Sequence, residues 1–195
     1  MRKLFLFLVS VVCYLTSFSQ QQGTFKDTRD SKVYKTIKIG NQIWFAENFA
    51  YQPTTGKYWK QDNDSSNLIY GYFYDWETAK KICPVGWHLP TIEDWEQLIN
   101  TVGNPTSAGK LKSKEYWESP NFGATNESGF NAVPAGCINL YNVLFCVKGQ
   151  YSNMWANKEY GSQFAYYIEL NHKTAAASQQ ACDKKFGLTV RYIKD

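Results

Sequence analysis

The residues best placed for chemistry stand in one short stretch, ICPVGWHLPTIEDWEQLI, which runs from Ile82 to Ile99. It holds His88, one of two histidines in the chain, with Asp94 close behind it. A histidine beside a carboxylate is the pairing that general acid–base catalysis uses. Two prolines and a glycine around this histidine instead predict a tight connection between two helices. We therefore interpret His88 as a hydrogen-bonded residue of a structural corner.

The motifs of common active sites are absent from the sequence. It contains no G-x-S-x-G elbow, no H-E-x-x-H helix and no phosphate-binding glycine loop. The densest acidic cluster, around Asp62 to Asp64, is not followed by a glutamate at EF-hand spacing, and we interpret it as a solvated loop. We expect no catalytic residues, no metal and no cofactor, and hence a protein that is not an enzyme.

A second group of side chains has the chemistry of sugar recognition. Tyrosine rings stack on sugar rings, and asparagine amides bond to sugar hydroxyls. Tyrosines and asparagines gather late in the chain, after the stretch SGFNAVPAG, and the candidate ligand-binding residues are Asn139, Tyr141, Asn142, Tyr151 and Asn153.

The N-terminus has the three-part layout of a secretory signal peptide. Arg2 and Lys3 precede an apolar run that ends at Leu15, and small residues follow at Ser17 and Ser19. We predict a signal peptide over residues 1–19 and a single exported domain over residues 20–195. The expected location is extracellular or on the cell surface, with the periplasm as the alternative.

Neither a membrane nor a nucleic acid is an expected partner. The N-terminal apolar run is shorter than the roughly 20 residues that a membrane-spanning helix needs, and no later run is longer. Val12, not a small residue, precedes Cys13, so we expect no lipid anchor at that cysteine. The formal charge is only +4 and no basic run is visible, which argues against nucleic acid.

Four cysteines follow the predicted signal peptide, and an even number in an exported chain favours disulfides. Cys137 and Cys146 flank a stretch with a predicted turn at its centre, so we prefer the pair Cys137–Cys146. Cys83 and Cys182 then remain as a tentative second pair. Their spacings do not resemble the paired C-x2-C arrangement of a zinc site.

Hydrophobic patterning predicts an α+β domain with two helices early in the chain. Alternating residues over 33–39 and 43–45 flank Gly40-Asn41 and predict a hairpin. Residues 52–67 have a loop composition, and an aromatic strand is expected over 68–76. Asp75 and Thr91 can cap two short helices. Further strands are expected over 130–136, 142–149, 164–170 and 188–193.

Four ordered blocks of the sequence resemble the Fibrobacter succinogenes major paralogous domain of exported bacterial proteins. They are YKTIKIGNQIWFAENF, YGYFYDWETAKKICPVGWHLPTIEDWEQL, SGFNAVPAG and GLTVRYIKD. The central block is also similar to C-type-lectin-like domains and, more distantly, to formylglycine-generating enzymes. The resemblance implies a C-type-lectin-like fold, with two helices, small antiparallel β-sheets and long late loops that carry ligand sites. It also implies that Trp155 belongs to the core.

The sequence departs from the family in two places: the cysteine pair before the aromatic strand is missing, with Lys57 and Leu68 nearby instead, and the end of the chain differs. The family ends in Val-Arg-Cys, whereas Tyr192 stands at the matching position here. In the family that cysteine is expected to bond to the cysteine matching Cys83, so Cys83 lacks its implied partner and Cys182 is the candidate substitute.

The function expected from the whole chain is that of a non-enzymatic binding module for polysaccharide or a surface protein. The alternative is a structural component of a surface assembly without a small ligand, and the third reading is an enzyme related to the formylglycine generators.

Overall fold

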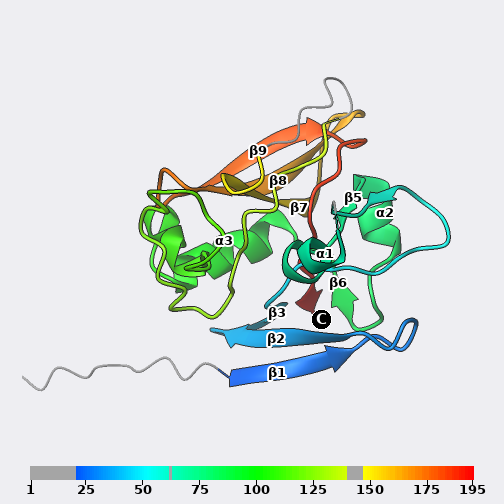
Figure 1. The fold of residues 1–195 in the computed structure, drawn as a ribbon, viewed down its shortest axis with the longest axis horizontal. Helices are drawn as coiled ribbons and strands as arrows, with labels where there is room; N and C mark the ends of the chain where they lie inside the picture. The colour runs from blue at the N-terminus through cyan, green and yellow to red at the C-terminus, as the bar shows by residue number, and fades with distance from the viewer. Residues whose placement is uncertain (1–20, 62, 140–146) are drawn as a thin grey trace, which may run out of the picture.

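The computed structural model describes residues 21–61, 63–139 and 147–195, and it shows an α+β arrangement (Figure 1). The predicted signal peptide lies outside these ranges. The elements are β1 (Gln21–Lys26), β2 (Val33–Ile39), β3 (Gln42–Phe45), β4 (Tyr58–Trp59), α1 (Asp64–Tyr70), β5 (Phe73–Tyr74), α2 (Trp76–Lys81), β6 (Trp87–His88), α3 (Ile92–Thr101), the 3-10 helix η1 (Pro105–Leu111), β7 (Tyr151–Tyr160), β8 (Phe164–Asn171), β9 (Ala177–Asp183) and β10 (Ile193–Lys194). In the described part of the chain, no helix is long and apolar enough to cross a membrane.

A five-stranded antiparallel sheet brings the first and last of these strands together, in the order β1-β2-β3-β10-β6. The predicted hairpin is confirmed, because Ile39 pairs with Gln42 and Gly40 turns the chain at a φ of +59°. β1 pairs with β2 along its whole length and forms one edge of the sheet. Near the chain terminus, β10 lies between β3 and β6 (Figure 1).

A separate three-stranded sheet has the order β7-β8-β9. The strand predicted over 164–170 is confirmed as β8, which pairs with β7 across a bulge between Trp155 and Glu159. Strand β9 was not predicted, because its small and polar residues show no apolar alternation. The strand predicted over 188–193 is much shorter than expected, since only Ile193–Lys194 forms a strand there. The stretch 130–136 makes only isolated bridges, and most of 142–149 lies outside the described residues.

Both predicted helices are confirmed, with the expected caps. The side chain of Asp75 accepts from the Thr78 amide at the start of α2. At α3, Thr91 and Asp94 form a complete capping box.

For residues 64–70 the prediction was wrong, and of the aromatic strand expected over 68–76 only Phe73–Tyr74 forms a strand, β5. Asp64–Tyr70 is the helix α1, where we expected a loop and then a strand. Asn63 caps it by accepting from the Ser66 amide, and Gly71 follows it at a φ of +70°. The Asp62–Asp64 region, interpreted as a solvated loop, therefore contains a helix start, although residue 62 itself is outside the described ranges.

The two faces of the β2–β3 hairpin pack against different cores, because alternate strand residues point to opposite faces. Ile37 and Trp44 join a core with α3 and η1. Tyr34 and Phe45 join a second cluster that we call the aromatic core, which contains Tyr34, Phe45, Phe49, Tyr74, Trp76, Trp87, Trp155 and Tyr192. Much of the aromatic content of the chain is therefore structural.

Candidate functional site

His88 lies at the end of β6, in the predicted corner. Its Nδ1 is 2.7 Å from an Asp195 carboxylate oxygen, and its Nε2 is 3.2 Å from Asp94 Oδ2. The same Asp94 oxygen accepts from the amide (2.9 Å) and the hydroxyl (2.7 Å) of Thr91. Desolvation acts to raise the pKa of Asp94, but the hydrogen bonds from Thr91 and His88 outweigh it, and the net effect lowers that pKa. Both ring nitrogens are engaged, as expected of a structural corner residue.

The tentative disulfide between Cys83 and Cys182 is not present, because both are free cysteines. Cys83 follows α2, where its thiol donates to the Trp87 carbonyl at 3.0 Å. Burial raises the pKa of Cys83 to about 12, so at neutral pH it is a thiol and a poor nucleophile. Cys182 lies in β9, opposite Ala165, and burial raises its pKa too.

Tyr192 makes a hydrogen bond at the place where the family resemblance implied a disulfide. It is fully buried in the aromatic core, and its hydroxyl donates to the Ala79 carbonyl of α2 at 2.6 Å. A hydrogen bond thus ties β10 and its approach to the helix that precedes Cys83. Cys137 is buried at 1% exposure, whereas Cys146 lies outside the described residues, so the preferred pair Cys137–Cys146 stays a prediction.

The structure describes three of the five predicted ligand-binding residues, Asn139, Tyr151 and Asn153. Asn153 is only 2% exposed, and its carbonyl accepts from the amide (3.1 Å) and the hydroxyl (2.8 Å) of Thr189. Tyr151, at the start of β7, and Asn139 are half-buried. Tyr141 and Asn142 lie outside the described residues, so the set as a whole stays a prediction. Trp155 is confirmed as a core residue with no exposed surface.

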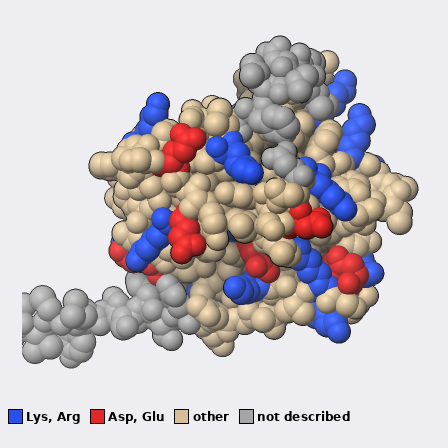
Figure 2. Space-filling model, in the orientation of Figure 1, with Lys and Arg blue, Asp and Glu red and all other residues tan. Residues whose placement is uncertain are grey.

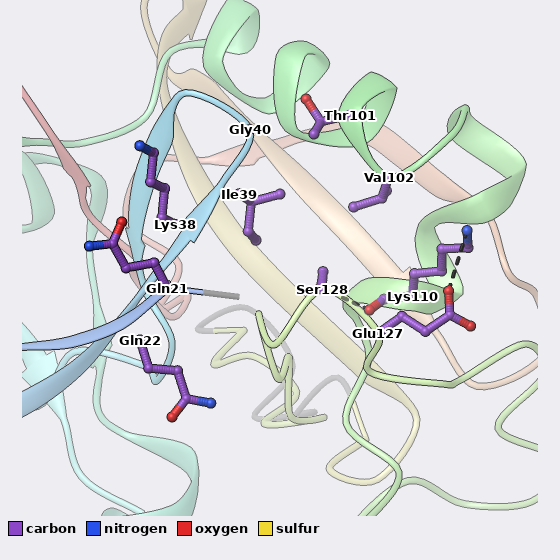
Figure 3. A pocket seen from close by; sticks show the side chains of 10 residues that line it. All are labelled: Gln21, Gln22, Lys38, Ile39, Gly40, Thr101, Val102, Lys110, Glu127 and Ser128. Carbon is purple, nitrogen blue, oxygen red and sulfur yellow. Dashed lines mark hydrogen bonds and ion pairs between the residues drawn. The ribbon is translucent and has the colours of Figure 1, made fainter. Parts of the chain in front are cut away.

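A cavity of about 850 Å³ opens elsewhere, between the β1–β2 strands and the end of α3. Its lining comprises Gln21, Gln22, Lys38, Ile39, Gly40, Thr101, Val102, Lys110, Glu127 and Ser128. Figure 3 shows the strand residues on one side and the residues from α3, η1 and the later loop on the other, with Ile39 and Val102 in the space between them. The volume lies within the range of ordinary small-ligand pockets.

The cavity has an apolar floor and a polar rim. Ile39 and Val102 are 5% and 8% exposed, because each also packs into the core. At the rim, Lys110 pairs with Glu127 at 3.4 Å, and the Ser128 hydroxyl donates to the Lys110 carbonyl at 2.9 Å. Lys38 lies on the opposite side of the hairpin in Figure 3, with its ammonium pointing away from Val102.

One wall is the loop Thr125–Asn131, which we call the polar loop. The Asn131 amide donates to Asn126 Oδ1 at 2.9 Å, and Asn126 Nδ2 donates to Asn131 Oδ1 at 3.2 Å. Both asparagines have positive φ, +53° and +56°, a conformation that asparagine tolerates better than most residues. The loop is thus closed on itself by its own side chains.

Arg191 anchors the polar loop from inside the protein. Its guanidinium donates to the Asn131 carbonyl and to Asn48 Oδ1, both at 2.8 Å, and also to the Phe130 carbonyl. It lies over the Phe130 ring at 4.5 Å and is fully buried. Burial lowers the pKa of Arg191 to about 9, which leaves it charged at neutral pH.

Basic and acidic side chains are interspersed on the face of the molecule shown in Figure 2, and no single sign dominates. No group of three or more His, Cys, Asp or Glu side chains that could hold a metal ion occurs in the described ranges.

Sequence reasoning missed this cavity. Its residues come from five separate segments, and only the fold brings them together. A signal was present in TNESGFN, residues 125–131, where small and polar residues predict a loop, although the last two of these residues belong to the strand predicted over 130–136.

The comparisons with known proteins give a family but no relative. A search of curated proteins found no significant match, and a search of solved structures found none. The family model of the Fibrobacter succinogenes major domain matches residues 37–194, which include β3, the helices α2 and α3, the polar loop and Arg191. The chain therefore belongs to the Fibrobacter succinogenes major domain family.

Proposed function

We propose that this chain is an exported, non-enzymatic binding module of the cell surface or extracellular space, with a C-type-lectin-like fold, that recognises polysaccharide. The observation that carries the proposal is the cavity with an apolar floor and an amide- and hydroxyl-rich rim. A sugar ring has an apolar face of C–H groups and an edge of hydroxyls. Ile39 and Val102 suit the face, and Gln22, Thr101 and Ser128 suit the edge.

The fold assignment and the location rest on further support. The helices α2 and α3 and the small antiparallel sheets, with the first and last described strands in one sheet, are features expected of a C-type-lectin-like domain. The signal-like N-terminus supports export. The engaged His88 and the high pKa of the Cys83 thiol favour binding over catalysis.

The test is binding of residues 20–195 to immobilised xylan, mannan, laminarin and pullulan, measured by affinity electrophoresis and calorimetry. Gln22→Ala should weaken binding about tenfold, the effect of about 1.4 kcal/mol. Gln180→Ala is the matched control, because Gln180 is an exposed glutamine of β9, in the other sheet, whereas Gln22 lies in β1. Equal binding by both variants, or no binding to any polymer by the folded protein, would reject the proposal.

A second candidate is a protein-contacting role in a surface assembly. One observation favours it: the end of the β7–β8 hairpin carries Tyr160 at 57% exposure and Phe164 at 41%. The Tyr160 ring also lies 5.3 Å from that of Tyr166. Exposed aromatic clusters are common in protein interfaces. Binding to a surface protein that is lost on Tyr160→Ser, with no polysaccharide bound, would support this role.

A further inference from the structure

The cavity described above does not end at the polar loop. A second cavity, of about 640 Å³, shares Gln22 with it and runs along β1 and β2 to Asn126, Gly129 and Asn131. A third, of about 430 Å³, shares Asn126 and Asn131 with the second. Each of the three falls within the size range of a small-ligand pocket. Because neighbouring cavities share lining residues, they adjoin one another beside the polar loop, and we call the three together the groove.

The walls of this groove keep the same chemistry along its length. The middle part is lined by Thr24 of β1 and by the two asparagines of the polar loop. The floor there remains apolar, with Ile37 and Ala46. Lysines and glutamates both occur along the walls, but hydroxyls and amides provide most of the polar groups.

The far end of the groove carries an aromatic side chain. Tyr116 lines the third cavity together with Ser113, Lys114, Glu115 and Thr125. It is 46% exposed, and its ring lies 5.8 Å from that of Tyr70, which is itself buried. One side of Tyr116 is therefore supported by the protein and much of the rest is open to solvent. This is the arrangement in which a ring can stack on a ligand.

The groove is held in shape before any ligand arrives. The paired asparagines close the polar loop, and Arg191 holds two of its carbonyls from the core. On the other wall, β1 is paired with β2 over six residues. A wall that is already ordered loses little conformational freedom on binding.

We infer that this groove binds an extended stretch of a polysaccharide chain, and not a single sugar or a chain end. The inference rests on the proposed function and deepens it, by assigning the near end of the ligand to Gln22 and Ser128 and a far unit to stacking on Tyr116. A single sugar would fill one cavity and leave the other two unused. A polymer segment contacts all three, so affinity depends on chain length.

The experiment measures affinity by calorimetry for oligosaccharides from disaccharide to hexasaccharide, cut from whichever of xylan, mannan, laminarin or pullulan binds. Affinity should rise with length. Tyr116→Ala should weaken the hexasaccharide about tenfold, a loss of about 1.4 kcal/mol, and leave the disaccharide unchanged. Gln22→Ala should weaken both. Tyr160→Ala is the matched control, because Tyr160 is an equally exposed tyrosine outside the groove.

The outcomes separate this inference from the function on which it rests. If no polymer binds to folded protein, the proposed function fails, and the extended groove with it. If a polymer binds and Gln22→Ala weakens it, but affinity is independent of length and Tyr116→Ala has no effect, the function stands and the extended groove is rejected. Circular dichroism and the thermal midpoint of each variant confirm that it is folded.

Discussion

The groove and the aromatic core lie on different sides of the β2–β3 hairpin and are held together by different means. In the aromatic core, rings pack on rings, and the few polar atoms at their tips find backbone acceptors. The indole N–H of Trp155 donates to the Tyr74 carbonyl at 2.8 Å, and that of Trp76 to the Ala156 carbonyl at 2.9 Å. Such a region excludes water and leaves no room for a ligand.

Behind the groove, two buried cations hold neighbouring segments together by donating hydrogen bonds to backbone carbonyls. Arg191 donates to carbonyls of the polar loop, and Lys112 donates to the carbonyls of Asn171 and Thr174, both at 3.0 Å. Burying a charge is costly unless its hydrogen bonds are made. The walls of the groove are polar and open, and buried polar groups support them. We expect this support to be more sensitive to substitution and pH than the ring packing of the aromatic core.

The largest effect should come from Arg191→Met. The substitution keeps most of the side-chain length but removes donors to the Phe130 and Asn131 carbonyls and to Asn48. Breaking such a buried network should lower the free energy of unfolding by about 3 kcal/mol, measured by urea denaturation. Lys158→Met, at an exposed cation, is the control. A loss below about 1 kcal/mol would mean that the polar loop is held without Arg191.

Tyr192→Phe tests the aromatic core in the same way. The ring remains, and only the hydroxyl that donates to the Ala79 carbonyl is lost. Leaving that buried carbonyl without its donor should cost about 1–2 kcal/mol, again measured by urea denaturation. Tyr160→Phe, at an exposed position, should change stability by less than about 0.5 kcal/mol. Equal losses for the two variants would show that the tie to α2 contributes nothing.

We also expect the free energy of unfolding to depend on pH through Lys112, one of the two buried cations behind the groove. Burial lowers the pKa of Lys112 to about 8, from the ordinary value of 10.5. Between these values the unfolded chain binds more protons than the folded one, so stability rises as pH increases from about 8 towards 10.5. The free energy of unfolding relative to Lys112→Met should therefore grow by about 1 kcal/mol from pH 7 to pH 9. A difference that is flat, or that falls with pH, would contradict this.

The smallest effect on stability should come from the groove lining itself. Gln22 is exposed, so Gln22→Ala should change the free energy of unfolding by less than about 0.5 kcal/mol while it weakens polysaccharide binding. A thermal melt and a binding isotherm on the same sample measure both. A large loss of stability would place Gln22 among the supporting residues and remove it from the binding surface.

Local signals predicted the parts of the fold that local chemistry determines. Gly40-Asn41, Asp75 and Thr91 each specify a turn or a cap within a few residues, and each was found as predicted. Strand β9 was missed because an edge strand of small and polar residues is fixed by its neighbour β8, not by its own pattern. The helix α1 was missed because its cap at Asn63 resembles loop composition.

The site was harder to predict than the fold. Asn153 has the chemistry of a ligand-binding residue, but its position in β7 directs it into the interior. An amide on a strand can contact a ligand or pack in the core, depending on which face of the strand it occupies. Because β7 contains a bulge, simple alternation along its sequence does not give that face. The groove itself exists only after β1 and the polar loop, about a hundred residues apart in sequence, are placed side by side.

The position of β10 has a consequence for how the chain folds. Ile193 pairs with Trp44 on one side and His88 on the other, so the largest sheet cannot be completed until β10 is in place. Contacts this distant in sequence slow folding, since a long loop must close before they form. A chain without residues 193–195 therefore keeps this sheet open, because β3 and β6 lose their shared partner.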